Sequence, residues 1–330
     1  MRIFLTGISG QMGSHFAELA INLGHEIIGL VRPSSDRGYS RLGNLINSRN
    51  VTLVEGDLLD LSSISRLFKD YKPTAVMHYA AQSQVGTSFN QPFNTFQVNT
   101  VGSVNLLEAM RNYSAESPGV FLSTSETFGN NYSYLNKLDD GMTVYVQNEK
   151  TTFNPVSPYG TSKLAMYWMV KNYQESYKMP VKCAIQFNSE GERRGEYFVT
   201  RKITKWIGKH IRGESSEPLY LGSINGIYRD WSHATDSVYA HYLLLLSNSL
   251  DSYVVGSGET HSLAEFLELS FSHAGLGNWK SYVEQNAAFV RPNELFCLCS
   301  DPSKIMGDLA WSPKVSFSEL VKRMVDNDIR

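Results

Sequence analysis

The feature that most constrains the fold is a glycine-rich turn that begins close to the N-terminus. Residues 2–5 have the apolar character of a short buried strand, and residues 14–23 have the amphipathic period of a helix. The turn between them reads Thr6-Gly7-Ile8-Ser9-Gly10-Gln11-Met12-Gly13. Glycines let a backbone approach a ligand closely, and the N-terminus of the following helix attracts an anion. This order predicts a nucleotide-phosphate site, although similar spacing also occurs in tight turns that bind nothing.

Strand-like and helix-like segments alternate over the first half of the chain. The predicted strands cover residues 26–31, 51–54, 75–78, 120–122 and 181–187, and the predicted helices cover residues 62–71, 99–111 and 158–177. Such alternation is typical of a parallel sheet with helices on both faces. Past residue 200 the alternation weakens. We therefore expect an α/β protein with a Rossmann-type doubly wound parallel sheet and a smaller mixed α/β C-terminal lobe.

Composition excludes several classes of partner. The 330 residues are 42% hydrophobic and 19% charged, and the net charge is −2. This charge gives no attraction to nucleic acid or to an anionic membrane. The N-terminus lacks the apolar core of a signal peptide, and no later segment approaches a membrane-spanning length. We expect a cytoplasmic protein whose partners are small molecules and copies of itself.

The three cysteines do not suggest a metal site. Cys297 and Cys299 form a Cys-x-Cys pair, but no second pair of Cys or His accompanies them, and Cys183 is distant in sequence. We expect reduced, mostly buried thiols and no bound metal.

The candidate catalytic residues lie in two segments. Thr124 and Glu126 follow the apolar strand 120–122 and should lie just past its carboxyl end, where parallel sheets bind ligands. Tyr159 and Lys163 share one face of the helix that follows Ser157, a predicted N-cap. A phenol near an ammonium and an oxidised nicotinamide loses its proton more easily and becomes a general base. The alternative is an ordinary exposed helix face.

The second strand predicts which dinucleotide binds. It ends in Arg32, followed by Ser34 and Ser35, instead of the acidic residue that holds a ribose 2′-hydroxyl. These side chains suit a 2′-phosphate and therefore NADP, the alternative being a solvated arginine. Asp57, after the third strand, is suited to accept a hydrogen bond from the adenine amino group. His78 is expected to be a hydrogen-bonded strand histidine and not a catalyst.

Two other segments are notable. Residues 130–150 are polar and show no clear period, so they are either a lid over the site or a surface insertion without a role. Residues 187–203 carry basic side chains that an amphipathic helix does not explain, which suggests a site for phosphates.

Together these segments resemble the GDP-mannose 4,6-dehydratase family of the extended short-chain dehydrogenase/reductases, over nearly the whole chain. The marks of the wider group are Gly7, Gly10, Gly13, Asp57-Leu58, Tyr159 and Lys163. The more specific marks are Thr124-Ser125-Glu126, Phe187-Asn188 through Arg193-Arg194-Gly195, Phe198-Val199-Thr200-Arg201-Lys202-Ile203, Arg229-Asp230-Trp231 with His233 and Asp236, and Arg291-Pro292 with Glu294.

The resemblance implies a role for each matching residue. Catalytic residues would be Thr124, Glu126, Tyr159 and Lys163. NADP would contact Gly7, Ser9, Gly10, Gln11, Met12, Gly13, Arg32, Ser34, Ser35, Asp57, Leu58, Ala80, Ala81, Gln82, Ser83, Lys163 and Arg194. A GDP-hexose would contact Ser83, Asn188, Val199, Lys202, Arg229, Arg291 and Glu294. The family also implies a homodimer or homotetramer whose double-arginine loop reaches a neighbouring subunit's cofactor.

The chain departs from the family pattern at several places. Met12 replaces the usual Asp, Ser189 replaces the usual His, and Gly191-Glu192 replaces a Ser-Pro pair. The loop after Gly129 is longer than in the family. These departures lead us to expect changes in NADP affinity, subunit packing or sugar specificity.

The expected function is that of an NADP-dependent nucleotide-sugar 4,6-dehydratase, converting GDP-mannose to GDP-4-keto-6-deoxymannose. Residues 1–187 would bind NADP and carry the catalytic residues, and residues 188–330 would mainly bind the nucleotide sugar, with some segments returning to the first domain. The alternatives are a nucleotide-sugar 4-epimerase, a 4-ketoreductase and a non-catalytic NADP-binding protein.

Overall fold

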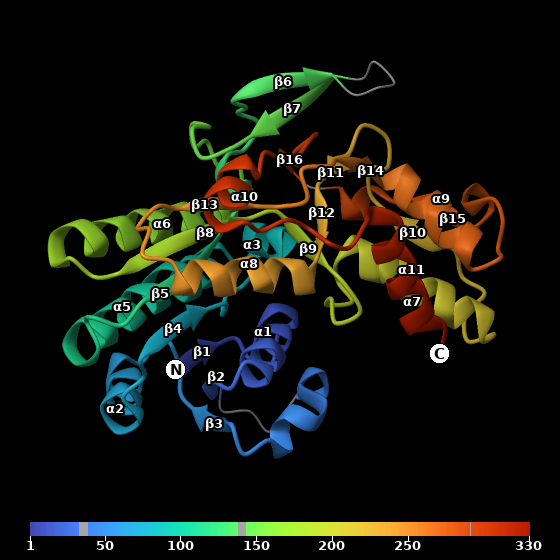
Figure 1. Cartoon of the computed structure of the whole chain (residues 1–330). Helices are drawn as coiled ribbons and strands as arrows, with labels where there is room; N and C mark the ends of the chain where they lie inside the picture. The colour runs from blue at the N-terminus through green and yellow to red at the C-terminus, as the bar shows by residue number, and fades with distance from the viewer. Residues whose placement is uncertain (33–38, 138–142, 291) are drawn as a thin grey trace.

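A parallel sheet forms the centre of the computed structural model, which describes residues 1–32, 39–137, 143–290 and 292–330. Its strands are β1 (Arg2–Thr6), β2 (Glu26–Val31), β3 (Val51–Glu55), β4 (Ala75–His78), β5 (Gly119–Thr124), β8 (Val181–Gln186) and β13 (Tyr253–Val255). Across the described residues they follow the order β3-β2-β1-β4-β5-β8-β13, stacked from bottom to top in Figure 1. The order reverses between β1 and β4, which creates a ligand-binding crevice at the carboxyl ends. The expected doubly wound sheet is confirmed.

Helices cover both faces of this sheet. One face packs against α1 (Gln11–Asn22) and α8 (Ala234–Leu246), and α10 (Ser303–Leu309) lies beside β13. The other face packs against α2 (Leu61–Tyr71), α5 (Gly102–Tyr113) and α6 (Pro158–Tyr177). Fully buried aliphatic and aromatic side chains fill the two interfaces, so the sheet is a rigid support for residues at its carboxyl edge.

The C-terminal lobe is mixed, as expected, and lies on the right in Figure 1. Its helices are α7 (Val199–Ile211), α9 (Leu263–His273) and α11 (Phe317–Ile329), with short turns η4 (Trp279–Ser281) and η5 (Ala287–Phe289). Two-stranded sheets pair β10 (Leu219–Leu221) with β15 (Val283–Gln285), β11 (Tyr228–Arg229) with β14 (His261–Ser262), and β12 (Trp231–His233) with β9 (Asn188–Glu190). A separate apolar core joins the three helices. Although both are late in sequence, β13 is a strand of the central sheet and α8 packs against that sheet.

Several helix boundaries differ from the sequence prediction. Helix α1 begins at Gln11, so the second half of the glycine turn already belongs to the helix. Helix α5 begins at Gly102 and follows a π-helical turn, η2 (Gln97–Val101). The chain also forms three short helices, η1 (Ser40–Asn47), α3 (Val85–Asn90) and α4 (Pro92–Phe96). Glycine and short polar segments carry too weak a period to mark such boundaries.

Residues 130–150 contain a hairpin, which the sequence did not predict. Strands β6 (Tyr134–Lys137) and β7 (Thr143–Gln147) pair antiparallel, and β7 also pairs in parallel with β16 (Cys299–Ser300). Val144 and Val146 face inward while Thr143 and Tyr145 are exposed. This alternation covers too few residues to stand out, and its partner strand is distant in sequence.

The cysteines and His78 are as expected. The three cysteines are free and buried. His78 lies between Thr6 Oγ1 at 2.7 Å and Ser103 Oγ at 2.8 Å, which confirms a satisfied strand histidine. Within the described ranges, no cluster of His, Cys, Asp and Glu has the geometry of a metal site. In the same ranges, every helix is too short or too polar to cross a membrane.

Candidate active site

The end of β5 presents the first catalytic candidates. The strand ends at Thr124 and continues into the single turn η3 (Ser125–Thr127). Thr124 Oγ1 accepts a hydrogen bond from Glu126 N at 3.3 Å, and Thr127 Oγ1 donates to Thr124 O at 2.6 Å. These bonds cap the turn and place Thr124 at the carboxyl end of β5 and Glu126 just past it, and both residues are buried.

Helix α6 brings Tyr159 to the same place. Ser157 caps the helix, since its Oγ accepts from Gly160 N at 3.0 Å, and Pro158 occupies the first turn. A Cβ at Gly160 would lie 2.8 Å from Glu126 O. Glycine at this position therefore allows the start of α6 to pack directly on the turn that carries Glu126. This close approach places Tyr159 beside the η3 turn.

The environment of the Tyr159 phenol holds it in the neutral form. Burial raises the pKa of Tyr159 to about 12. A hydrogen bond from Thr124 and the charge of Arg194 lower this pKa, whereas the charge of Glu126 raises it. The structure thus brings Thr124, Glu126 and Tyr159 together, with Arg194 of the double-arginine loop close enough to act on the phenol.

Lys163 lies one turn further along α6. Its Nζ donates to Leu122 O at 2.7 Å, and burial lowers the pKa of Lys163 to about 8. The ammonium is therefore held on the backbone of β5.

Asn99 is a site residue that the sequence analysis missed. Its Nδ2 donates to Ser162 Oγ at 2.9 Å and to Gln82 O at 3.0 Å, and its Oδ1 accepts from Gln82 N at 2.8 Å. Asn99 therefore connects α6 to the segment 80–83 after β4. The predicted helix began at Asn99, and Asn is a favoured residue at a helix start, so this role left no signal in the sequence.

The glycine turn has the geometry of a phosphate site. Gly7 has a φ of +71°, and a Cβ at Gly13 would lie 2.1 Å from Gly7 O. Gly10 is the N-cap of α1, and no side chain caps the helix among the described residues. Backbone N–H groups of the first turn are therefore available to an anion.

The side chains of Gln11 and Met12 point elsewhere. Gln11 Nε2 donates to Ser189 O at 2.9 Å, and Ser189 Oγ donates to Met12 Sδ at 3.2 Å. Two departures from the family pattern, Met12 and Ser189, are thus in contact with each other. They form one local change that joins α1 to β9.

The remaining cofactor candidates lie along the same edge of the sheet. Arg32 and Asp57 are exposed at the ends of β2 and β3, and Asp57 Oδ1 accepts from Leu59 N at 2.9 Å. Leu58 is buried in the core between the sheet and α2. Ala80, Ala81, Gln82 and Ser83 follow β4, where Ala80 N donates to Thr6 Oγ1 at 3.1 Å. Ser34 and Ser35 lie outside the described residues.

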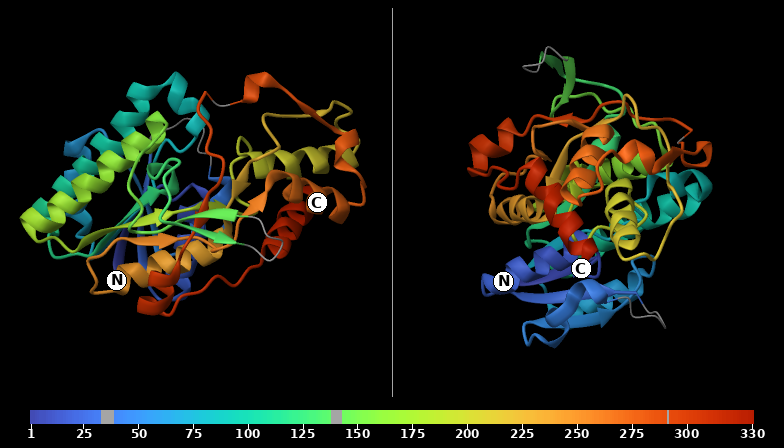
Figure 2. Two further views of the ribbon diagram at one scale, coloured as in Figure 1. Left: turned by 90° about the horizontal axis from the view of Figure 1, so that it is seen from above. Right: turned by 90° about the vertical axis from the view of Figure 1, so that its right-hand side faces the viewer.

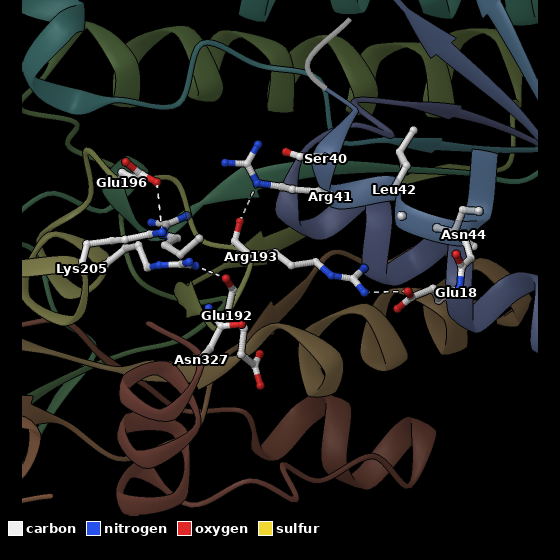
Figure 3. Close-up of a pocket in the computed structure, with 14 residues that line it drawn as sticks. Glu18, Ser40, Arg41, Leu42, Asn44, Glu192, Arg193, Glu196, Lys205 and Asn327 are labelled. Atoms are coloured by element: carbon white, nitrogen blue, oxygen red, sulfur yellow. Dashed lines mark hydrogen bonds and ion pairs between the residues drawn. The ribbon is translucent and has the colours of Figure 1, made fainter. Parts of the chain in front are cut away.

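The double-arginine loop, residues 191–196, borders a cavity of about 540 Å³ between α1, η1 and α7 (Figure 3). The cations that line it are Arg41, Arg193, Arg194, Arg201 and Lys205. Arg193 Nη2 lies 2.6 Å from Glu18 Oε1, and Arg41 Nε donates to Arg193 O at 2.8 Å. Arg194 Nε lies 3.0 Å from Glu190 Oε2. Ion pairs within the chain hold this loop, and its contact with phosphates stays a prediction.

Apart from Ser83, which follows β4, the described substrate candidates lie on the C-terminal lobe. Arg229 Nη2 lies 2.8 Å from Glu294 Oε1, so the structure brings these two residues together. Lys202 Nζ donates to Tyr220 O at 2.6 Å and lies 3.6 Å from the centre of the Phe289 ring.

Two further candidates begin secondary-structure elements that border the same lobe. Asn188 begins β9, and Val199 begins α7. Arg291 lies outside the described residues.

Comparison with known proteins decides between the families that share this site. The family model for GDP-mannose 4,6 dehydratase matches residues 4–324. The chain belongs to the GDP-mannose 4,6-dehydratase family. A relative is GDP-mannose 4,6 dehydratase 1 of Arabidopsis thaliana, 40% identical over 335 residues, which cover 98% of this chain and 89% of the relative. The family is one of hydro-lyases, so the chain is an enzyme of the nucleotide-sugar 4,6-dehydratase type.

Solved structures share the fold without separating the activities. The dTDP-glucose 4,6-dehydratase DesIV of Streptomyces venezuelae, in complex with NAD, superposes with a TM-score of 0.85 at 23% identity, covering 99% of this chain and 96% of that one. The UDP-glucose 4-epimerase of Thermus thermophilus, also with NAD, gives 0.81 at 29% identity, covering 99% and 98%. Dehydratases and epimerases thus share this architecture, and the difference lies in the site residues.

Proposed function

We propose that the protein is an NADP-dependent GDP-mannose 4,6-dehydratase, which converts GDP-mannose to GDP-4-keto-6-deoxymannose. The observation that carries the proposal is the buried group of Thr124, Glu126 and Tyr159 at the carboxyl edge of the sheet. A hydroxyl, a carboxylate and a phenol in one place supply the proton transfers of an elimination. Membership of the dehydratase family supports the same reaction.

The residues present fit NADP. The uncapped start of α1 and the positive φ of Gly7 suit a pyrophosphate, and Arg32 suits a 2′-phosphate. We include in the proposal that NADP contacts the residues assigned to it from the sequence. When bound, NADP would supply a hydride acceptor for sugar C4, a hydride donor for C6 and, in its oxidised form, a positive charge that favours loss of a proton from a phenol.

The protein's own groups manage the protons. Tyr159 takes the O4 proton while Thr124, already hydrogen-bonded to the phenol, orients O4. The ketone formed at C4 acidifies the proton on C5. Glu126 removes this proton and passes one to the hydroxyl that leaves C6 as water. Once C6 has gained a hydride, Tyr159 donates to C5 the proton that it took from O4.

The direct test is mass spectrometry of GDP-mannose incubated with the protein. We expect a product that has lost one water, and deuterium placed at C4 should appear at C6 of this product. Transfer of deuterium to free NADPH would contradict an internal hydride return. An epimerase would give a product of unchanged mass, and a non-catalytic protein would leave GDP-, CDP-, UDP- and dTDP-hexoses unchanged.

Arg32→Ala tests the cofactor assignment. Removing the guanidinium should weaken NADP binding by about 10- to 100-fold, since a hydrogen bond between charged groups contributes roughly 1.5–3 kcal/mol. NAD binding, which involves no 2′-phosphate, should not change. Calorimetric titration with each dinucleotide measures both. Arg49→Ala, at another exposed arginine beyond η1, is the matched control. Equal losses for NADP and NAD would assign Arg32 a purely structural role.

We also propose that the protein acts as a homodimer or homotetramer. Phe93, Phe96 and Trp168 are exposed on α4 and α6, and Phe93 is 73% exposed in the single chain. Large apolar side chains that are exposed in the single chain favour association between copies of the protein.

A further inference from the structure

The β6–β7 hairpin is the segment that the proposed reaction leaves without a role. It follows Gly129 closely in the chain and stands out above the sheet (Figure 1). Seen from above, its strands run from the side of α6 towards the C-terminal lobe (Figure 2). Strand β7 pairs with β16, which follows Glu294 in sequence. The hairpin therefore connects the segment that leaves the catalytic strand with a segment of the substrate candidates.

Gln147, at the end of β7 and fully buried, holds the hairpin to the catalytic segment. Its Nε2 donates to Gly129 O at 3.2 Å and to Asn131 O at 2.8 Å. Gly129 has a φ of +60°, and a Cβ there would lie 1.9 Å from Asn154 O. Asn154 N donates to Thr127 O at 2.9 Å. The turn that leaves the catalytic strand is thus fixed between Asn154 and Gln147.

The backbone of the same residue holds the hairpin to the C-terminal lobe. Gln147 O accepts from Asp301 N at 2.9 Å, and Gln147 pairs with Ser300 in the β7–β16 ladder. Ser300 N donates to Asp230 Oδ2 at 3.0 Å. Asp230 is fully buried and directly follows Arg229. A continuous chain of hydrogen bonds therefore leads from Gly129 to the residue beside Arg229.

Apolar packing stabilises this connection. Val144 and Val146 on the inner face of β7 pack against Cys297, Cys299 and Tyr228. Tyr228 precedes Arg229, and its O accepts from Leu298 N at 3.1 Å. The hairpin thus reaches both residues that flank Arg229.

We propose that Gln147 is a positioning residue for the dehydration. Through it, the hairpin sets the Arg229–Glu294 pair at a fixed distance from Thr124 and Glu126. This inference rests on the proposed function and adds to it, because it assigns the alignment of the sugar to a residue that touches neither substrate nor cofactor.

The two halves of the site stand on different supports, which gives the proposal a kinetic signature. The Arg229–Glu294 pair belongs to the C-terminal lobe, and the catalytic group belongs to the sheet. Loosening the link should leave each half able to bind its own part of the substrate. Only the reaction, which needs both halves in register, should slow.

Gln147→Leu tests the proposal, since leucine fills a similar volume and donates no hydrogen bond. We expect kcat for GDP-mannose to fall about 10- to 100-fold, while the dissociation constants of GDP and NADP change less than about twofold. The absorbance of reduced nicotinamide measures oxidation at C4 separately from elimination. It shows whether oxidation continues when elimination has slowed. Leu135→Ser, on the exposed strand of the same hairpin, should leave all these quantities unchanged.

Asn148→Ala provides a second variant if Gln147→Leu does not fold. Asn148 Nδ2 donates to Asp301 Oδ2 at 3.2 Å, so its loss loosens the same ladder from a partly exposed position. An unchanged kcat in the folded variants would overturn the proposal. So would a loss of GDP binding equal to the loss of kcat. Failure of the wild-type protein to dehydrate GDP-mannose would instead reject the proposed function.

Discussion

Glu126→Gln should abolish the loss of water while C4 oxidation survives. The substitution keeps the size of the side chain and removes the base for the C5 proton, so turnover should fall about 10²- to 10⁴-fold. Tyr159 remains in place, and reduced nicotinamide should therefore accumulate on the protein after GDP-mannose is added. Rapid-mixing absorbance and mass spectrometry of the sugar measure the two steps separately.

The same variant should shift the pH dependence of C4 oxidation. The charge of Glu126 raises the pKa of Tyr159, so the neutral glutamine should lower this pKa and move the oxidation rate profile to lower pH. Glu284→Gln, at an exposed carboxylate on β15, is the matched control and should change neither step. Undiminished conversion of the nucleotide sugar by Glu126→Gln would favour an epimerase, whose reaction needs no carboxylate at this position.

The central sheet was predictable because each strand is a short, continuous apolar run that ends at glycine or polar residues. Residues 75–78 and 26–31 match β4 and β2 in full. The start of α1 was placed too late, because Gly10 and Gly13 resemble a loop in sequence. In the structure Gly13 belongs to the helix, since its missing side chain makes room for Gly7 O.

The places of the candidate catalytic segments in the fold were predictable because their signals are local. Ser157-Pro158 marks the start of α6, and the spacing of Tyr159 and Lys163 places both on one face. The supports of these residues were not predictable, because they depend on contacts between distant segments. Asn99 bonds to Ser162, and Gln147 bonds to Gly129 while pairing with Ser300. A single sequence contains no signal for such pairs until the fold brings them together.

The family resemblance located the substrate candidates but not their interactions. Arg229 and Glu294 were assigned separately, and in the structure they form an ion pair. Met12 and Ser189 were treated as independent departures, yet the two side chains touch. Replacing one of them alone would leave the other without its partner, so a variant should change both positions at once.

Tyr159→Phe should block the reaction before any hydride moves. Phenylalanine keeps the buried ring and removes the atom that takes the O4 proton in the proposed reaction, so C4 oxidation should fall about 10²- to 10⁴-fold. Neither reduced nicotinamide nor a dehydrated sugar should appear, in contrast to Glu126→Gln. NADP binding, measured by calorimetry, should be retained. Tyr173→Phe, also on α6, removes a hydroxyl that donates to Glu108 on α5; this variant is the control and should keep full activity.

The comparison of the two variants fixes the order of the proton transfers. If Tyr159 acts first, the variant that lacks its phenol cannot form the ketone, and Glu126 then has no acidified C5 proton to remove. Reduced nicotinamide should therefore appear in Glu126→Gln and be absent from Tyr159→Phe and from the double variant. Reduced nicotinamide in Tyr159→Phe would assign the O4 proton to another group, of which Thr124, hydrogen-bonded to the phenol, is the nearest candidate.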